Sequence, residues 1–222
     1  MSAPLPVVAL VSGRGTNLQA LLDEAGAGRL PVEFRAVISN RPDALGLERA
    51  TAAGIQTEVV DHRAFTERAD FDAALAASID AHTPALIVLA GFMRIFTDAF
   101  VERYRARMLN IHPSLLPDFR GLDTHQRALD AGVARHGATV HFVTPELDGG
   151  PPVAQVSVPV HADDDADTLA ARVLDREHRL YPLVVRWLAE GRLRFDGHTP
   201  YLDGRALTQP LLDPPELTDV AA

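Results

Sequence analysis

The sequence predicts an α/β fold, with a mostly parallel twisted sheet and helices on both of its faces. Over the first half of the chain, short apolar and β-branched runs alternate with amphipathic stretches. This alternation is typical of parallel strands joined by right-handed crossovers. After residue 112 it stops, and two apolar runs around a Gly-Gly-Pro-Pro loop predict an antiparallel C-terminal extension. Because such folds bind ligands at the carboxyl ends of their strands, we expect the functional site there.

Each expected element follows from the position of an apolar run. The first run is followed by a glycine-containing turn, so it predicts a strand that leads directly into a helix. The expected strands are residues 7–11, 35–39, 57–60, 85–89, 108–112, 139–144 and 153–160, and the expected helices are residues 17–25, 45–53, 65–81, 98–105, 122–131 and 165–189.

The last third of the chain predicts one long helix and a hairpin. Acidic residues 163–165 come directly before the long helix, and helix capping explains them better than a metal site does. Residues 192–207 predict a β-hairpin that turns at residues 196–197 or at residues 203–204. Since no repeat or linker interrupts residues 1–208, we expect a single domain there. The proline-rich residues 209–222 are expected to be a mobile tail.

The composition argues against several classes of function. The longest apolar stretch, residues 85–96, falls short of the roughly 20 residues that a membrane-spanning helix needs. The formal net charge of -9 argues against a general nucleic-acid surface. The absence of cysteine removes disulfides, thiolate metal sites and cysteine nucleophiles, and it fits a cytoplasmic protein. Residues 3–11 lack a basic leader, so no signal peptide is expected.

A glycine-containing turn links the first expected strand to the first expected helix, with the sequence Ser-Gly-Arg-Gly-Thr-Asn-Leu at residues 12–18. Gly13 and Gly15 allow backbone amides to approach a ligand closely, and a helix N-terminus favours phosphate. The dinucleotide-binding pattern is incomplete because Leu18 occupies its third glycine position, and the P-loop pattern is absent. A capped turn without a ligand explains this segment about as well as phosphate binding does.

Asn110 and His112 lie at the end of the strand expected at residues 108–112. Residues two apart on a strand point to the same face, so both side chains can reach one ligand atom. Pro113 keeps His112 extended and ends the strand. A carboxamide and an imidazole together can stabilise an oxyanion and move a proton near neutral pH. The alternative is that both side chains satisfy buried backbone groups.

Asp148 precedes two glycines that can bend the backbone around a site. Its carboxylate is suited to orienting His112 or to accepting a proton, although a plain Asp-Gly turn would be preferred if this segment stood alone. His141 either joins this group or packs in the core. His136 and His141 would point to opposite faces of one strand, so we expect no zinc and no other metal.

Taken together, five segments resemble the folate-dependent phosphoribosylglycinamide formyltransferase family. They are residues 12–20, 89–94, 110–117, 140–143 and 147–151. The resemblance extends over residues 7–207. It implies a Rossmann-like formyltransferase fold. It also implies transfer of a formyl group from 10-formyltetrahydrofolate to the amino group of glycinamide ribonucleotide in purine biosynthesis, by a monomer or homodimer.

The resemblance also implies a role for individual residues. Asn110 would stabilise the oxyanion formed when the amine attacks the formyl carbon, while His112 and Asp148 would assist with the proton. Glu177 would reach the ribose hydroxyls of the nucleotide. The residues implied to hold the nucleotide phosphate are Gly15, Thr16 and Asn17, and those implied to contact the folate are Arg68, Met93, Arg94, Ile95, Phe96, Val143 and Asp148.

Ordinary structural roles are the alternative for several of these residues. Met93, Ile95 and Phe96 are also typical core residues. Arg68 and Glu177 are also typical of solvated helix positions. For Glu177, the simpler interpretation would be preferred without the resemblance.

One loop departs from the family pattern. Asp118, Arg120 and Asp123 stand where relatives often carry a basic residue, a proline and a histidine. The ligand contacts of this loop are therefore left open.

Other functions remain as alternatives at this point. Formyltetrahydrofolate hydrolase and the methionyl-tRNA and nucleotide-sugar formyltransferases share the Asn-x-His-Pro-Ser motif. The tRNA enzyme is expected to carry a further C-terminal domain and a basic surface, and the hydrolase a further N-terminal domain, so the length and charge favour neither. A non-catalytic nucleotide-binding module would explain the glycine turn but would leave the polar residues at 110, 112 and 148 without a role.

Overall fold

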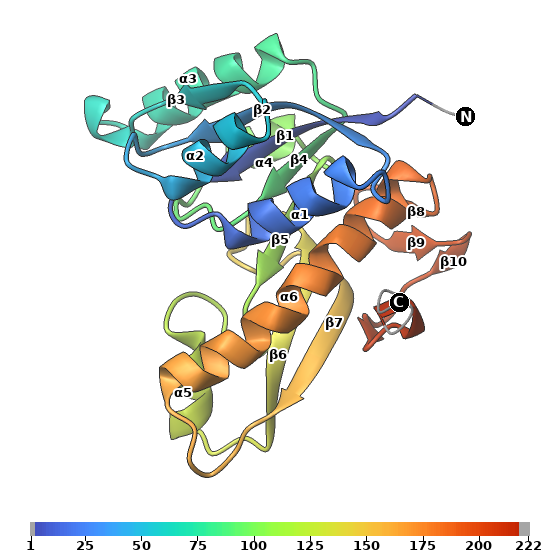
Figure 1. Cartoon of the computed structure of the whole chain (residues 1–222). Coiled ribbons are helices and arrows are strands. Elements are labelled where there is room, and N and C mark those ends of the chain that lie inside the picture. The colour runs from blue at the N-terminus through green and yellow to red at the C-terminus, as the bar shows by residue number, and fades with distance from the viewer. Residues whose placement is uncertain (1–2, 218–222) are drawn as a thin grey trace. The chain divides into compact units, whose positions relative to one another are not determined.

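The computed structural model describes residues 3–217, and the chain divides into two compact units after Asn110 (Figure 1). Hydrogen bonds join eight strands in the order β11-β7-β6-β5-β4-β1-β2-β3, and three further strands in the order β10-β9-β8. Strand β5 (Met108–His112) contains the boundary between the units. The prediction of a mainly parallel sheet with helices and an antiparallel extension is confirmed.

The first unit is a parallel sheet in which strands and helices alternate along the chain. Its elements are β1 (Leu5–Val11), α1 (Thr16–Gly26), β2 (Val32–Ser39), α2 (Leu45–Ala52), β3 (Thr57–Val59), the short 3-10 helix η1 (His62–Ala64), α3 (Arg68–Ala81), β4 (Leu86–Leu89), α4 (Asp98–Arg103) and the first residues of β5. Helix α3 begins three residues later than expected, because Phe65 is extended and ends η1.

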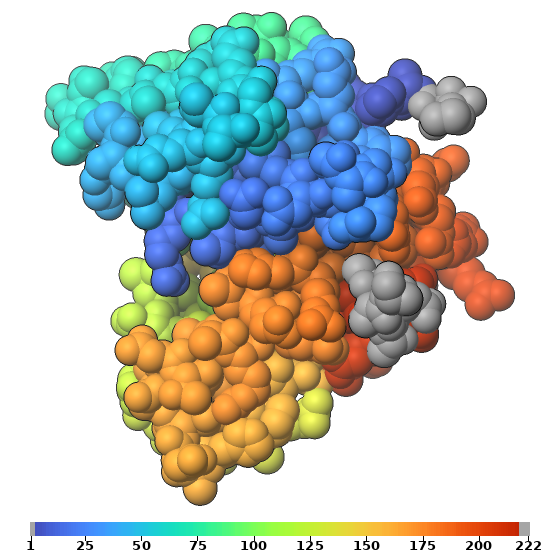
Figure 2. Space-filling model, in the orientation of Figure 1, coloured from blue at the N-terminus to red at the C-terminus, as the bar shows by residue number. Residues whose placement is uncertain are grey.

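Strand β1 lies in the middle of this sheet, paired in parallel with β2 on one side and β4 on the other. All five residues 7–11 are fully buried, as expected for a parallel strand that helices cover on both faces. Right-handed crossovers place α1 and α2 on one face of the sheet and α3 and α4 on the other (Figure 1). The blue atoms of α1 and α2 cover the first of these faces side by side (Figure 2).

The second unit combines an antiparallel strand pair with one long helix. Its elements are the end of β5, α5 (Thr124–Asp130), β6 (Arg135–Phe142), β7 (Pro152–Pro159), α6 (Ala166–Ala189), β8 (Leu193–Phe195), β9 (Pro200–Leu202), β10 (Arg205–Ala206), β11 (Leu211–Leu212) and the 3-10 helix η2 (Pro215–Leu217). Strands β6 and β7 pair antiparallel, and α6 packs against both.

Helix α6 begins where the acidic residues predict. Asp165 is its N-cap and accepts a hydrogen bond of 2.7 Å from the backbone N–H of Thr168. Asp164 instead forms an ion pair of 2.7 Å with Arg172 on the helix. Capping therefore accounts for Asp165, as predicted.

The segment expected to form one hairpin forms a three-stranded sheet, because both candidate turns are used. Asp196 accepts backbone hydrogen bonds from His198 and Thr199 at the turn between β8 and β9. Asp203 and Gly204, both with positive φ, form the turn between β9 and β10. The prediction that only one of the two turns would form was therefore wrong.

Part of the segment expected to be a mobile tail lies in regular structure. Strand β11 pairs in parallel with β7, and the carboxylate of Asp213 accepts hydrogen bonds from the backbone N–H and the hydroxyl of Ser157 at 3.1 and 2.8 Å. Leu217 is buried. Residues 218–222 lie outside the described part of the chain. Mobility at the tail and a single domain at residues 1–208 stay predictions.

Gly137 lies where the backbones of β6 and β7 approach closely. A Cβ at this position would lie 1.9 Å from the carbonyl oxygen of Val156, so we expect Gly137→Ala to force the strands apart and lower the free energy of unfolding by roughly 1–3 kcal/mol. Urea unfolding followed by circular dichroism measures this change. Gly26→Ala in α1 is the control, since the added Cβ would meet nothing within 4 Å. Equal unfolding midpoints for the two variants would contradict the prediction.

Candidate active site

Strand β5 carries Asn110 and His112 at its carboxyl end. This strand lies in the core, where Met108, Leu109 and Ile111 are buried. Asn110 is half-buried. Asn110 pairs with Leu89 of β4 in the parallel ladder. Because Asn110 and His112 are two residues apart on one strand, their side chains leave the same face of the sheet.

The imidazole of His112 is fixed by two contacts within the second unit. Its Nε2 lies 3.0 Å from the carbonyl oxygen of Phe119, and its Nδ1 lies 3.4 Å from Oδ2 of Asp148. A carbonyl oxygen only accepts hydrogen bonds, so Nε2 carries a proton and donates it. The nitrogen that gains or loses a proton is therefore Nδ1, which faces the carboxylate.

Asp148 is held in a backbone conformation that aims its carboxylate inward. Its φ of 47° lies in the left-handed region, which aspartate tolerates better than most residues. Oδ2 accepts a hydrogen bond of 2.9 Å from the backbone N–H of Gly121. Two positions further on, a Cβ at Gly150 would lie 1.8 Å from the carbonyl oxygen of Phe142, so only glycine allows this loop to fold back on β6.

His141 stands on the other side of the same carboxylate. Its Nε2 lies 3.9 Å from Oδ1 of Asp148, and its Nδ1 lies 3.0 Å from the carbonyl oxygen of Phe142. Burial lowers the pKa of His141, although the carbonyl of Phe142 and the charge of Asp148 oppose this shift. Of the two interpretations left open for His141, the structure favours the one in which it joins the polar group.

Residues 118–123 form a loop that supplies two backbone groups to this site. The carbonyl of Phe119 meets His112, and the N–H of Gly121 meets Asp148. Arg120 pairs with Glu146, which joins this loop to the one that carries Asp148. The sequence reasoning missed both backbone groups, because a peptide group leaves no signature in the residue type.

The three departures from the family pattern lie in this loop, and Arg120 is the one whose side chain forms the ion pair just described. The backbone carbonyl of Asp118 accepts a hydrogen bond of 2.6 Å from the hydroxyl of Ser114, and Asp123 occupies the N-cap position of α5 without a side-chain capping bond. Arg127 on α5 lies over the ring of Phe119, 5.6 Å from its centroid. The loop that touches His112 is therefore braced by side chains on both sides.

In the glycine turn of the first unit, two backbone carbonyls accept hydrogen bonds from residues of α2. The N–H of Gly46 donates to the carbonyl of Gly13 at 3.0 Å, and Nε of Arg49 donates to the carbonyl of Arg14 at 2.8 Å. Gly15 has a φ of 66°. A Cβ at this position would lie 2.6 Å from Cα of Gly46, so only glycine allows the two backbones to approach this closely. The first N–H groups of a helix have no acceptors within it, so this arrangement suits an anion at Gly15, Thr16 and Asn17.

The segment after β4 exposes apolar side chains. Met93 is 64% exposed and Ile95 is 52% exposed, so the alternative that they are core residues is wrong. Phe96 is half-buried and stacks between Phe92 and Phe100. Arg94, between the two exposed residues, is half-buried.

The remaining predicted residues lie on separate elements. Arg68 is exposed and begins α3 in the first unit. In the second unit, Val143 is half-buried directly after β6. Glu177 on α6 is only 5% exposed, so its interpretation as a solvated helix position is wrong. Of the predicted residues, the structure joins His112 and Asp148 by a direct contact, with Asn110 on the same strand as His112.

Comparisons with known proteins show the family of this chain. A family model described as Formyl transferase matches residues 5–185. The chain belongs to the formyl transferase family. It is 50% identical to the phosphoribosylglycinamide formyltransferase of Escherichia coli (strain K12) over 90% of this chain and 95% of that protein. A solved structure of the phosphoribosylglycinamide formyltransferase of Coxiella burnetii has a TM-score of 0.91 at 49% identity, and the match covers 95% of this chain and 100% of that one.

Other relatives carry the same name. The phosphoribosylglycinamide formyltransferase of Haemophilus influenzae is 45% identical over 90% of this chain and 95% of that protein. The predicted family and the predicted class of enzyme, a transferase of one-carbon groups, are confirmed. In residues 3–217, no helix is both long enough and apolar enough to cross a membrane.

The low pKa of the buried His136 is expected to make the free energy of unfolding depend on pH. Burial, with a smaller effect of the nearby His125, lowers the pKa of His136 to about 4, from 6.5 for an ordinary histidine. As the pH falls from 6.5 to 4, the unfolded chain therefore binds the proton before the folded protein does, and the free energy of unfolding falls. We expect the free energy of unfolding of His136→Phe to fall less, over the same pH range, than that of the original protein.

Urea unfolding at pH 7 and pH 5 measures the effect. His198→Gln, at an exposed position, is the control and should keep the decrease of the original protein. A decrease in His136→Phe as large as that in the control would show that His136 does not titrate in this window.

Proposed function

We propose that this protein transfers a formyl group from 10-formyltetrahydrofolate to the amino group of glycinamide ribonucleotide, in purine biosynthesis in the cytoplasm. The observation that carries the proposal is the contact between Nδ1 of His112 and the carboxylate of Asp148. The names of the relatives support the choice of acceptor. A monomer or homodimer stays the expected assembly.

Asn110 is the proposed oxyanion donor. When the neutral amine attacks the formyl carbon, a new carbon–nitrogen bond forms and the formyl oxygen gains negative charge. The carboxamide of Asn110 presents an N–H on the strand that also carries His112. Such a donor stabilises the charge where it develops and needs no rearrangement during the reaction.

His112 and Asp148 are the proposed groups that handle the proton. The attacking nitrogen must lose a proton, and the folate nitrogen N10 must gain one as its bond to the formyl carbon breaks. Since Nε2 of His112 already donates to Phe119, the exchangeable proton is the one at Nδ1. A negative carboxylate at 3.4 Å stabilises the protonated ring and accepts a proton from the amine through water.

The glycine turn is the proposed site for the nucleotide phosphate. Gly46 and Arg49 occupy the carbonyls of Gly13 and Arg14, which leaves the helix N-terminus as a favourable place for an anion. In this proposal Gly15, Thr16 and Asn17 hold the phosphate. Glu177 binds the ribose hydroxyls, for which a buried carboxylate is a strong acceptor.

The segment after β4 is the proposed contact for the folate. The exposed side chains of Met93 and Ile95 offer apolar surface to a flat heterocycle. Arg94, Phe96, Val143 and Asp148 complete the proposed contacts of the ring. The exposed guanidinium of Arg68 is suited to the carboxylates of the folate tail.

One assay tests the proposed function. The protein is incubated with 10-formyltetrahydrofolate, with and without glycinamide ribonucleotide, and both formylated nucleotide and free formate are measured. We expect formylated nucleotide only when the acceptor is present. Formate released without the acceptor would favour a hydrolase, and no turnover in either arm would favour a nucleotide-binding module.

Removal of either proton-handling side chain should act on turnover more than on binding. We expect His112→Ala or Asp148→Ala to lower kcat by about 100-fold or more, with little change in the affinity for glycinamide ribonucleotide, because neither side chain holds its phosphate or ribose. Steady-state kinetics and calorimetric titration measure the two effects. Asp175→Asn removes an exposed carboxylate of α6 and is the control. Near-normal turnover in either alanine variant would contradict the assignment.

A further inference from the structure

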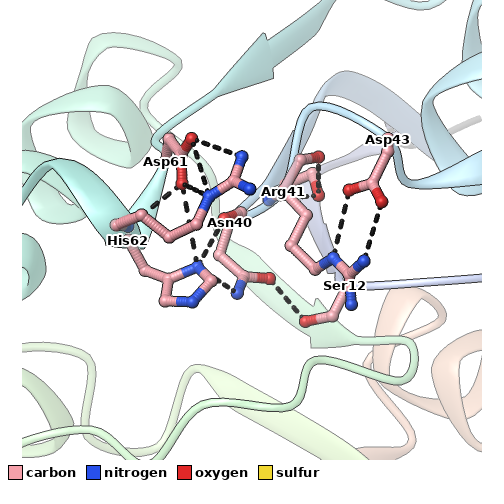
Figure 3. A network of polar contacts seen from close by, with 8 residues as sticks. Ser12, Asn40, Arg41, Asp43, Asp61 and His62 are labelled. Atoms are coloured by element: carbon pink, nitrogen blue, oxygen red, sulfur yellow. Dashed lines mark hydrogen bonds and ion pairs between the residues drawn. The ribbon is translucent and has the colours of Figure 1, made fainter.

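Three parallel strands of the first unit end at the same level of the sheet. Val11 is paired with Ser39, and Ser39 is paired with Val59, at the last position of each strand. The residues that follow are therefore neighbours in space. Ser12 follows β1, Asn40 follows β2, and His62 lies at the start of η1, just after β3 (Figure 3).

Ser12 and Asn40 are buried and bonded to one another. Ser12 is 5% exposed and Asn40 is 2% exposed. The hydroxyl of Ser12 donates to Oδ1 of Asn40 at 2.6 Å. With its single proton used in this bond, the hydroxyl oxygen presents only lone pairs to its other neighbours.

The segment after β4 uses one of these lone pairs. The backbone N–H of Met93 donates to Oγ of Ser12 at 2.8 Å, and the backbone N–H of Ser12 donates to the carbonyl of Gly91 at 3.2 Å. Ser12 is also the residue from which the glycine turn starts. One buried side chain therefore joins the turn after β1 to the segment after β4.

His62 fixes the other end of the Asn40 side chain. Nδ1 of His62 lies 3.1 Å from Nδ2 of Asn40 and 2.8 Å from the carbonyl oxygen of Asn40. In one tautomer the ring accepts from the carboxamide, and in the other it donates to the backbone carbonyl, so Asn40 is held in both. With Nδ2 directed to the ring, Oδ1 is directed to Ser12 (Figure 3).

The charged residues around this network pair with each other. Arg63 bonds to Asp61 and Arg41 bonds to Asp43, in both cases at the exposed rim of the network. Exposed pairs of this kind contribute little to stability. The buried Ser12–Asn40 bond is therefore the part that decides the geometry.

We propose that Ser12 and Asn40 are positioning residues that hold the phosphate-binding turn and the folate-binding segment at a fixed distance from each other. This inference rests on the proposed function for the identity of the two ligands. The physical connection, from the amide of Met93 through Ser12 to Asn40, does not depend on it. A transferase needs such a connection, because both substrates must be placed within reach of one reacting bond.

The loss of this connection should affect the binding of both substrates. Without the hydroxyl, the N–H of Met93 has lost its buried acceptor, and the two backbone segments can move independently. A lost buried hydrogen bond corresponds to roughly a tenfold change in an equilibrium constant. The side chains of His112 and Asp148 keep their contacts with Phe119 and Gly121, so turnover should change less than binding.

The first measurement uses the protein without ligands. Residue-resolved hydrogen exchange reports the amide of Met93, whose protection depends on Oγ of Ser12. We expect about tenfold faster exchange at Met93 in Ser12→Ala and in Ser12→Cys, a variant of similar size with a poor acceptor, and near-normal exchange in Ser12→Thr. Asn40→Ala should show a smaller increase. Unchanged exchange in Ser12→Ala and Ser12→Cys would overturn the connection.

The second measurement uses steady-state kinetics of the same variants. We expect KM for both substrates to rise about tenfold in Ser12→Ala and Ser12→Cys, with kcat within about threefold, and Ser12→Thr to restore both KM values. Ser78→Ala is the matched control, since it removes a serine hydroxyl that bonds to Glu58 elsewhere in the same unit. A rise in only one KM, or an equal rise in the control, would overturn the positioning role.

The two measurements separate this inference from the proposed function. If the original protein does not formylate glycinamide ribonucleotide, the proposed function fails, while the exchange of Met93 still tests the connection. If the original protein is active and Ser12→Ala has normal KM values, the positioning role fails alone. Normal exchange and KM values in Asn40→Ala would remove Asn40 from the proposal.

Discussion

The hydrogen-bond register of the parallel strands is the constraint on which the candidate site depends. Parallel ladders whose last pairs align, such as Val11 with Ser39, bring the next residues of different strands together without any further device. The glycine turn, the Ser12–Asn40 bond and the segment after β4 all begin at such strand ends. A shift of one residue in the ladder would turn each of these side chains to the other face.

In the second unit, a loop rather than a parallel ladder brings the polar side chains together. There the antiparallel pair β6 and β7 returns the chain through a glycine-containing loop, and the left-handed backbone of Asp148 directs its carboxylate toward His112. Backbone groups of Phe119 and Gly121 complete the contacts of these two side chains. A buried charge needs such partners, because an unsatisfied carboxylate would cost several kcal/mol.

The sequence was sufficient for the alternation of elements, because apolar runs such as residues 7–11 mark buried parallel strands directly. It also singled out His112 and Asp148, whose side chains the structure brings into contact, since an imidazole after a strand and an aspartate before two glycines are visible as residue types. The contacts of Phe119 and Gly121 were not visible, because they are made by peptide groups. The role of Ser12 in joining two segments was also hidden, since it depends on which strands are neighbours.

The burial of single residues could not be predicted reliably from their residue types. Met93 and Ile95 are apolar yet exposed, whereas Glu177 is charged yet buried, and each reverses the usual preference of its type. Such reversals concentrate where a protein binds other molecules, and they are consistent with the folate and ribose contacts proposed for these positions. The two candidate turns at residues 196–197 and 203–204 illustrate a different limit, because the sequence did not show that both would be used.

The short strand β11 has a consequence for the solubility of the protein. By pairing with β7, it occupies backbone groups along part of a long, mostly buried strand that would otherwise form the edge of the sheet. At the opposite end of the strand order, β3 has only three residues and carries the charged Glu58. Brief, charged or covered edges give a second chain little to pair with. The sheet therefore ends on both sides in strands that resist edge-to-edge aggregation.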